Sequence, residues 1–243
     1  MARQVRNETL NTEIADQLET LACAHRILEM EGHGDLTLGH MSLRDPEGRG
    51  LWLKCPGLGL GEVRDINDFI LIDFEGNQIA GAGGLHREWP IHTEIMRRRP
   101  DIEVVAHTHP FYTSLFSATR ERLADIILDS SCFAGAVPLF EGTSGLVDTI
   151  EKGAALAEEM GSANAVLMVN HGVAFCGPST TVATMNGVFL EKACKAQIVL
   201  NGSGLAWQES QDRKVGGTPL EKVLPMTTLE SHWQYLKRRL PPI

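Results

Sequence analysis

The sequence lacks a long apolar run. Nowhere does it contain the roughly 18 uninterrupted apolar residues that a membrane-spanning helix needs. Its first twenty residues, MARQVRNETLNTEIADQLET, are polar and lack the apolar stretch of a signal peptide. We therefore expect neither membrane insertion nor export, and a cytoplasmic location.

Basic residues are fewer than acidic residues in this sequence. The chain has 22 Lys and Arg against 31 Asp and Glu, which gives a net charge of -9. Proteins that bind nucleic acid need clustered Lys and Arg to displace the counterions of the phosphates. The one basic run, at residues 97–99, is typical of a solvated helix face. Nucleic acid is therefore not an expected partner.

Cysteine pairs of the CxxC type and internal repeats are also absent. An odd number of cysteines without such pairs favours reduced thiols over a disulfide framework. A chain of 243 residues, 43% of them hydrophobic, is long enough to bury one full core. We expect a single domain over residues 1–243, with a core at about 14–200 and a carboxyl-terminal loop and helix at 202–243. The five cysteines stand at positions 23, 55, 132, 176 and 194.

The apolar residues recur with periods that predict helices and strands in alternation, and hence an α/β fold. Helices are expected at residues 14–28, in WPIHTEIMRRRP, near 111–119 and 145–160, over 179–200 and over 229–239. Strands are expected in DLTLGHMSLRD, GLWLK, IEVVAH and AVLMVN, in a hairpin over DFILIDFEGNQIA and near 125–128, with a long loop at 202–227.

Histidines stand at the ends of two predicted strands. In VVAHTHP, His107 and His109 are two residues apart, so the period of a strand directs both imidazoles to one face. His171 follows the strand AVLMVN, and Gly172 lets the backbone turn away after it. Three neutral imidazoles with an open position suit a catalytic site for zinc or a similar divalent ion.

The segments GGLHREWPIHTEIMRRRPDIEVVAHTHP and MVNHGV resemble the class II aldolase/adducin family, and the similarity runs over about residues 14–200. The resemblance implies a three-layer αβα fold with a central, mostly antiparallel sheet flanked by helices. It also implies a homotetramer whose active sites lie at subunit interfaces.

The same resemblance implies roles for single residues. The HxH pair and the later NHG histidine of the family bind the metal, which places the ligands at His107, His109 and His171. Zinc is the expected ion, with manganese, cobalt or iron as alternatives. The acid/base of the family matches Glu88. His92, one helical turn later, is expected to pack behind the site.

The chain departs from the sugar-phosphate members of the family where those members hold phosphate. It has Gly39-His40-Met41-Ser42 in place of a GN-x-S element, Cys55-Pro56-Gly57 in place of a Thr-Gly loop, and His86-Arg87 in place of Ser-Ser. Imidazole and guanidinium groups suit a planar carboxylate better than a compact phosphate. The expected substrate is a small carboxylic acid, bound by His40, Ser42, Gly57, His86 and Arg87.

Two of these assignments have alternatives. Arg87 could be solvated or could pair with Glu94 or Asp101. Aldolases of the family tend to use a tyrosine after the HxH helix, where this chain has Ser130 and Ser131. Without that proton donor, the same metal chemistry favours decarboxylation, which the family includes.

The leading hypothesis is a non-oxidative decarboxylase of a hydroxylated aromatic carboxylic acid, dihydroxyphthalate-like, or of a related hydroxy or oxo acid in catabolism. One alternative is an aldolase that cleaves a small hydroxy-carbonyl compound or a sugar phosphate. Another is an adducin-type interaction module without catalysis. An epimerase would need a second acid, and the sequence suggests no residue for that role.

Overall fold

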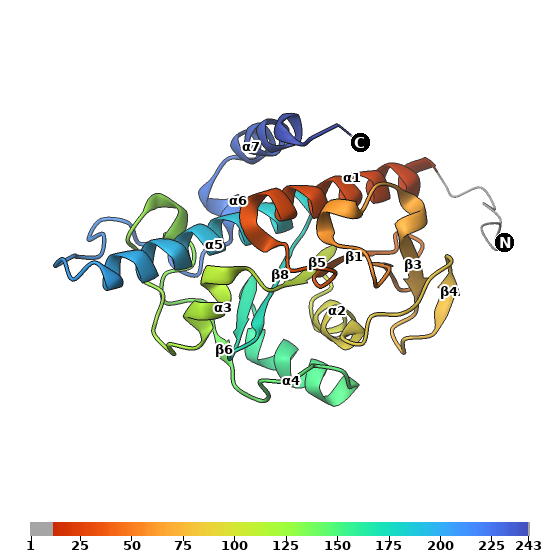
Figure 1. Ribbon diagram of the computed structural model, residues 1–243, viewed down its shortest axis with the longest axis horizontal. Helices are drawn as coiled ribbons and strands as arrows, with labels where there is room; N and C mark the ends of the chain where they lie inside the picture. Colours follow the sequence, from red (N-terminus) through yellow and green to blue (C-terminus); the bar gives the residue numbers. More distant parts are fainter. Residues whose placement is uncertain (1–11, 243) are drawn as a thin grey trace.

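The structure, a computed structural model, describes residues 12–242 and consists of one sheet between two layers of helices (Figure 1). The polar segment at residues 1–11, part of the region where no signal peptide is expected, lies outside the described residues. The helices are α1 (Thr12–Leu28), α2 (Trp89–Arg98), α3 (Phe111–Ser117), α4 (Ile150–Met160), α5 (Thr180–Gly202), α6 (Leu220–Val223) and α7 (Met226–Arg239).

The sheet has eight strands in the order β4-β3-β2-β1-β5-β8-β7-β6. Every neighbouring pair is antiparallel except β6 and β7, so the predicted mostly antiparallel three-layer fold is confirmed. The strands are β1 (His40–Arg44), β2 (Leu51–Lys54), β3 (Phe69–Ile72), β4 (Gln78–Ala80), β5 (Val104–Thr108), β6 (Leu139–Phe140), β7 (Ala165–Met168) and β8 (Gly172–Gly177).

Each face of the sheet has its own apolar core. Alternation along β5 places Val104 and Ala106 in the core under α1 and α5, and Val105 in the core over α2 and α4. The helix α7 packs on α1 and α5 (Figure 1). All five cysteines are buried and unpaired, as expected for reduced thiols. Within residues 12–242, no helix is both long and apolar enough to cross a membrane.

Some predicted elements were wrong. The strand expected near 125–128 is absent, because Oγ of Ser130 accepts the amides of Ile126 and Ile127 and a short 3-10 turn follows. The helix expected from residue 145 begins only at Ile150, after the amino-terminal cap Thr149.

Differences also occur at the ends of other elements. The strand β1 begins at His40 rather than Asp35, because a tight turn at 35–38 holds Leu36 at φ 52°. The strands β6 and β8 were not predicted, and the loop expected at 202–227 contains the short helix α6. None of these differences changes the layer order.

Candidate metal centre

The predicted metal ligands lie at the centre of the sheet. His107 is in β5 and pairs with His40 of β1 on one side and Ala174 of β8 on the other. His109 follows the end of β5, and His171 lies in the turn between β7 and β8. The antiparallel hairpin β7–β8 thus returns His171 to the place where β5 ends.

The four predicted residues come together. One ligand atom from each of Glu88, His107, His109 and His171 lies within 4.8 Å of the others. Nε2 of His107 is 3.1 Å from Nε2 of His109 and 3.4 Å from Oε2 of Glu88. Nε2 of His171 is 3.8 Å from the same carboxylate oxygen. Tetrahedral ligands at zinc distances stand about 3.4 Å apart, so these donors fit such an ion.

Contacts behind the ligands direct Nε2 toward the centre. Nδ1 of His107 lies 3.0 Å from the carbonyl oxygen of Val173, which can only accept, so Nδ1 carries the proton. Nδ1 of His109 lies 3.1 Å from Oδ2 of Asp35. Both contacts leave Nε2 with a free lone pair, the arrangement found in metal-binding histidines.

Two histidines of this centre, His109 and His171, are neutral at pH 7. Burial, together with the neighbouring His107 and His171, lowers the pKa of His109 to about 4. Burial also lowers the pKa of His171. Neutral imidazoles bind a divalent ion without first releasing a proton.

The absence of a side chain at Gly172 allows the turn that carries His171 to approach His109 closely. A Cβ atom at this position would lie 2.5 Å from the carbonyl oxygen of Thr108 and 2.6 Å from Cδ2 of His109. The turn therefore has no room for a side chain, which explains the glycine that follows His171.

Glu88 is an ionised carboxylate in this setting. Its Oε1 accepts the amide of Val147 at 2.8 Å. Burial raises the pKa of Glu88, but contact with His107, the Val147 amide and His171 together outweigh it and lower that pKa to about 2. A divalent cation would act in the same direction. Val147 reaches Glu88 because residues 145–149 are not helical.

A second group of histidines lies beside the first. The ring of His40 is 5.4 Å from that of His107 and 4.2 Å from that of His86, measured between centroids. Nδ1 of His40 is 2.6 Å from Nε2 of His92, which lies behind the site as predicted. Burial lowers the pKa of His86 to about 4 and that of His40 well below its usual range. These imidazoles are neutral at pH 7.

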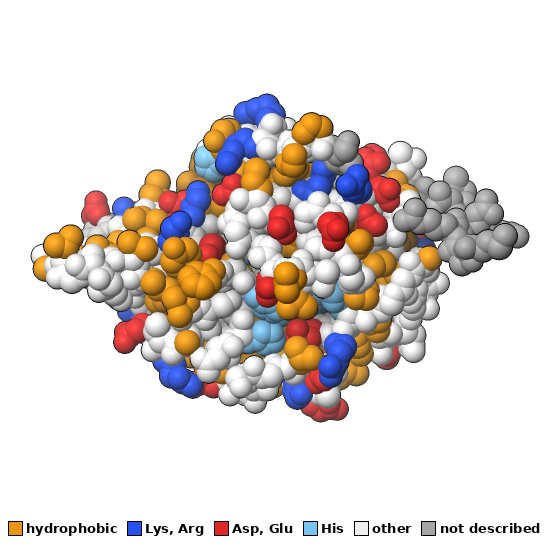
Figure 2. Space-filling view, viewed as in Figure 1, with side chains coloured by type: hydrophobic (Ala, Val, Ile, Leu, Met, Phe, Trp, Pro, Cys, Tyr) orange, Lys and Arg blue, Asp and Glu red, His pale blue; other side chains and the backbone are white. Residues whose placement is uncertain are grey.

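A cavity of about 240 Å³ opens over these groups. Its wall combines three segments that lie before β1, after β2 and before α2. Histidine side chains gather at the middle of the face seen in Figure 2. Of the predicted residues, the cavity is lined by His40, Gly57, His86, Arg87, Glu88 and His109.

Two of the predicted substrate-binding residues do not lie deep in the cavity. Ser42 is fully buried and does not line the cavity, because its hydroxyl lies 2.6 Å from Nδ1 of His92. The side chain of Arg87 is 74% exposed and pairs with Asp148 at 3.0 Å, not with Glu94 or Asp101. Arg87 thus stands at the mouth of the cavity, where a solvated ion pair can exchange partners.

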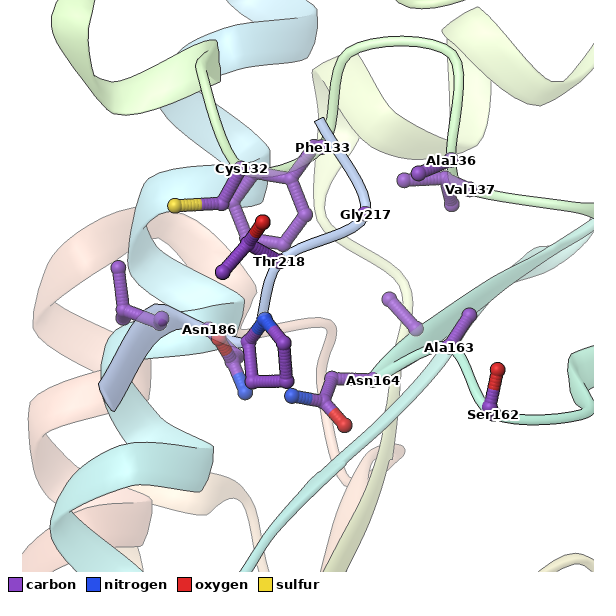
Figure 3. A pocket seen from close by; sticks show the side chains of 13 residues that line it. Cys132, Phe133, Ala136, Val137, Ser162, Ala163, Asn164, Asn186, Gly217 and Thr218 are labelled. Atoms are coloured by element: carbon purple, nitrogen blue, oxygen red, sulfur yellow. The ribbon is translucent and has the colours of Figure 1, made fainter. Parts of the chain in front are cut away.

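A different, smaller cavity of about 30 Å³ lies where the loop at 216–219 meets the first turns of α5 and the start of β7 (Figure 3). No histidine, carboxylate, lysine or arginine lines it. Nδ2 of Asn186 there donates to the carbonyl oxygen of Cys176, which is a contact within the fold. The Cys132 thiol lines this cavity, but burial raises its pKa and none of the lining residues is a base that could activate it.

Sequence reasoning did not identify Asp35 or Val147 as parts of the site. Asp35 is 74 positions before His109, and Val147 is 59 positions after Glu88. Neither stands in a local motif, and Val147 contributes only its backbone amide. Such contacts depend on the folded arrangement of distant loops.

Comparisons with known proteins identify relatives of this chain. The family model for the class II aldolase and adducin N-terminal domain matches residues 19–198. A 3,4-dihydroxyphthalate decarboxylase of Arthrobacter keyseri is 28% identical over 216 residues, covering 83% of this chain and 85% of that protein.

Solved structures share the fold. An aldolase II superfamily protein from Pseudomonas syringae superposes with a TM-score of 0.81 at 24% identity, over 96% of this chain and 95% of that one. An L-fuculose 1-phosphate aldolase from Glaciozyma antarctica PI12 superposes with a TM-score of 0.76 at 24% identity, over 97% and 94% of the two chains.

Proposed function

We propose a function from one premise: the chain belongs to the class II aldolase and adducin family. Enzymes of this family include decarboxylases and aldolases, both of which break carbon–carbon bonds. Our proposal is a metal-dependent, non-oxidative decarboxylase of a hydroxylated aromatic carboxylic acid in catabolism. We further propose zinc as its ion and a homotetramer with interfacial active sites as its assembly.

The composition of the cavity wall carries this proposal. His40 and His86 line the cavity beside Glu88, and Arg87 stands at its mouth. Flat imidazole rings on a wall suit a planar aromatic acid. Arg87 can bind a carboxylate in a two-pronged contact once it releases Asp148. The decarboxylase relative, named for a dihydroxylated aromatic diacid, supports the same substrate class.

His107, His109 and His171 would hold the ion through Nε2. A bound divalent ion would supply Lewis acidity to the adjacent oxygens of the substrate. Oε2 of Glu88 lies 3.4 Å from Nε2 of His107 and 3.8 Å from Nε2 of His171, so it stands at a fourth corner of the site. Substrate oxygens that take this corner would release Glu88 to act as a base.

Glu88 would then accept one proton and later donate it. As a carboxylate it takes the proton from a substrate hydroxyl that binds at the centre. The bond from the ring carbon to the carboxylate carbon breaks, carbon dioxide leaves, and the electron pair stays on the ring carbon. Glu88 returns its proton to that carbon, and water restores the hydroxyl proton. The net change replaces a carboxylate by hydrogen and takes one proton from solvent.

Aldol cleavage is the second candidate. An L-fuculose phosphate aldolase of Methanococcus maripaludis is 25% identical over 67% of this chain. The same histidines and Glu88 would serve that reaction. Ser130 and Ser131, the residues expected where aldolases have a tyrosine, do not line the cavity.

The test combines metal analysis with a substrate screen. Purified protein, loaded with zinc or manganese or stripped by a chelator, is assayed for carbon dioxide release from hydroxylated benzoic and phthalic acids. Sugar phosphates are assayed in parallel for cleavage. Glu88→Gln should lower turnover by about 100-fold or more while metal stays bound. Glu230→Gln, at an exposed position of α7, is the matched control.

Metal-dependent release of carbon dioxide that Glu88→Gln abolishes would support the decarboxylase. Cleavage of a sugar phosphate would overturn it in favour of the aldolase. A protein that binds no metal and turns over neither class would favour the adducin-type interaction module.

A further inference from the structure

Ser42, His92 and His40 form a buried chain of hydrogen bonds that ends at the cavity. The hydroxyl of Ser42 is 3.4 Å from the carbonyl oxygen of Val105 and 2.6 Å from Nδ1 of His92. Nε2 of His92 is 2.6 Å from Nδ1 of His40. Ser42 and His92 are fully buried, and only His40 lines the cavity.

The carbonyl at the far end sets the direction of this chain. A carbonyl oxygen can only accept, so the Ser42 hydroxyl donates to Val105 and accepts at its own oxygen. His92 then donates from Nδ1 to Ser42 and accepts at Nε2 from the Nδ1–H of His40. This direction makes three hydrogen bonds, whereas the reverse direction makes two and leaves the Val105 contact unused.

The direction fixes which nitrogen of His40 is bare. With the proton on Nδ1, Nε2 keeps its lone pair and can accept a hydrogen bond. We propose that Nε2 of His40 is the acceptor for a second hydroxyl of the substrate, one that does not bind the metal. This inference rests on the proposed decarboxylase function and narrows its substrate to acids with at least two hydroxyl groups.

His40 would act here by recognition. The chain ends on a carbonyl that cannot take a proton, so it holds one tautomer and conducts no proton away. A bare ring nitrogen is an acceptor, which fits a hydroxyl donor rather than a carboxylate, since a carboxylate can only accept.

The direct test is nitrogen NMR of the zinc-loaded protein labelled with ¹⁵N-histidine. Chemical shifts and N–H couplings distinguish a protonated from a bare ring nitrogen, and the spectrum of His40→Gln identifies the His40 signals. We expect Nδ1 protonated and Nε2 bare. A protonated Nε2 in the wild-type protein would overturn the inference.

A binding measurement tests the consequence. We expect one of 2,3-, 2,4- and 2,5-dihydroxybenzoate to bind the zinc-loaded protein about 10-fold more tightly than 2-hydroxybenzoate, the gain of one buried hydrogen bond. This gain should vanish in His40→Leu and survive in part in His40→Gln, whose amide oxygen still accepts. No gain for any isomer in the wild type would overturn the inference.

These experiments distinguish a failure of the decarboxylase proposal from a failure of the proposed role of His40. If the expected tautomer and the hydroxyl gain are observed without any release of carbon dioxide, the decarboxylase function fails and the role of His40 stands. If carbon dioxide is released but Nε2 is protonated, the role of His40 fails alone.

Discussion

Replacing Asp35 by alanine removes a hydrogen bond that orients one metal ligand. Oδ2 of Asp35 lies 3.1 Å from Nδ1 of His109, and His107 is oriented by a backbone carbonyl that substitution cannot remove. Losing a partner behind a ligand typically weakens metal binding by about 10- to 100-fold. Because the Asp35 side chain is 40% exposed, we expect the lower half of that range.

The fold itself should be unaffected. The turn at Asp35 is closed by its backbone carbonyl, which accepts the amide of Leu38 at 2.9 Å and survives in the alanine variant. We therefore expect the free energy of unfolding of the metal-free Asp35→Ala protein to differ from that of the wild type by no more than about 0.5 kcal/mol, as for other surface changes.

The assay is competition for zinc with a chelator of known affinity, alongside thermal unfolding of the metal-free protein. Asp35→Asn should fall between the wild type and Asp35→Ala, because its amide oxygen still accepts but carries no charge. Asp16→Ala, at an exposed position of α1, is the control and should match the wild type. Equal zinc affinity for wild type and Asp35→Ala would refute the reasoning.

Three further predictions concern the centre and the stability of the fold. His171→Ala should lose stoichiometric zinc after dialysis, measured by elemental analysis, and full occupancy would contradict the ligand set. Gly172→Ala should lower zinc affinity by about 10-fold or more, because its Cβ would displace the backbone at Thr108 or the ring of His109. An unchanged affinity would show that the turn relaxes without cost. Asp45→Asn should cost about 2 kcal/mol in denaturant unfolding, since Asp45 is buried and bonded to Arg49 and Trp52. Burial raises the pKa of Asp45, but these bonds outweigh it and the net pKa is lowered. The stabilisation is therefore complete above the unfolded pKa of about 3.9 and is lost as pH falls through the folded value. When the free energy of unfolding is measured at decreasing pH, Asp45→Asn should lose less stability than the wild type. Parallel curves of stability against pH for the two proteins would contradict this.

The sequence predicted those parts of the fold that depend on local pattern. Apolar periodicity identified α1 and α7, and the period of two placed His107 and His109 on one side of β5. The strand β6 has two residues, and β8 begins and ends with glycine, so neither shows a strand pattern of useful length.

The site could be predicted only where its residues stand in motifs. His171 precedes a glycine that the turn requires, and Glu88 was found through the family resemblance. The turn of Asp35 and the segment of Val147 meet the site through folding alone. Ser42 was predicted to bind substrate, but it lies behind His92, and this position depends on which way β1 faces in the sheet.

The proposed metal ligands and the wall of the cavity are held by different parts of the fold. His107 lies in the middle of the sheet, where hydrogen bonds on both sides fix β5, and His171 lies in the adjoining β7–β8 turn. Much of the wall, in contrast, comes from connections at 37–39, 56–57 and 85–87. Loops of this kind tolerate exchange far better than the strands that carry them. A protein engineer could therefore graft new sequences onto these three connections to select a new substrate while leaving the ion and its chemistry in place.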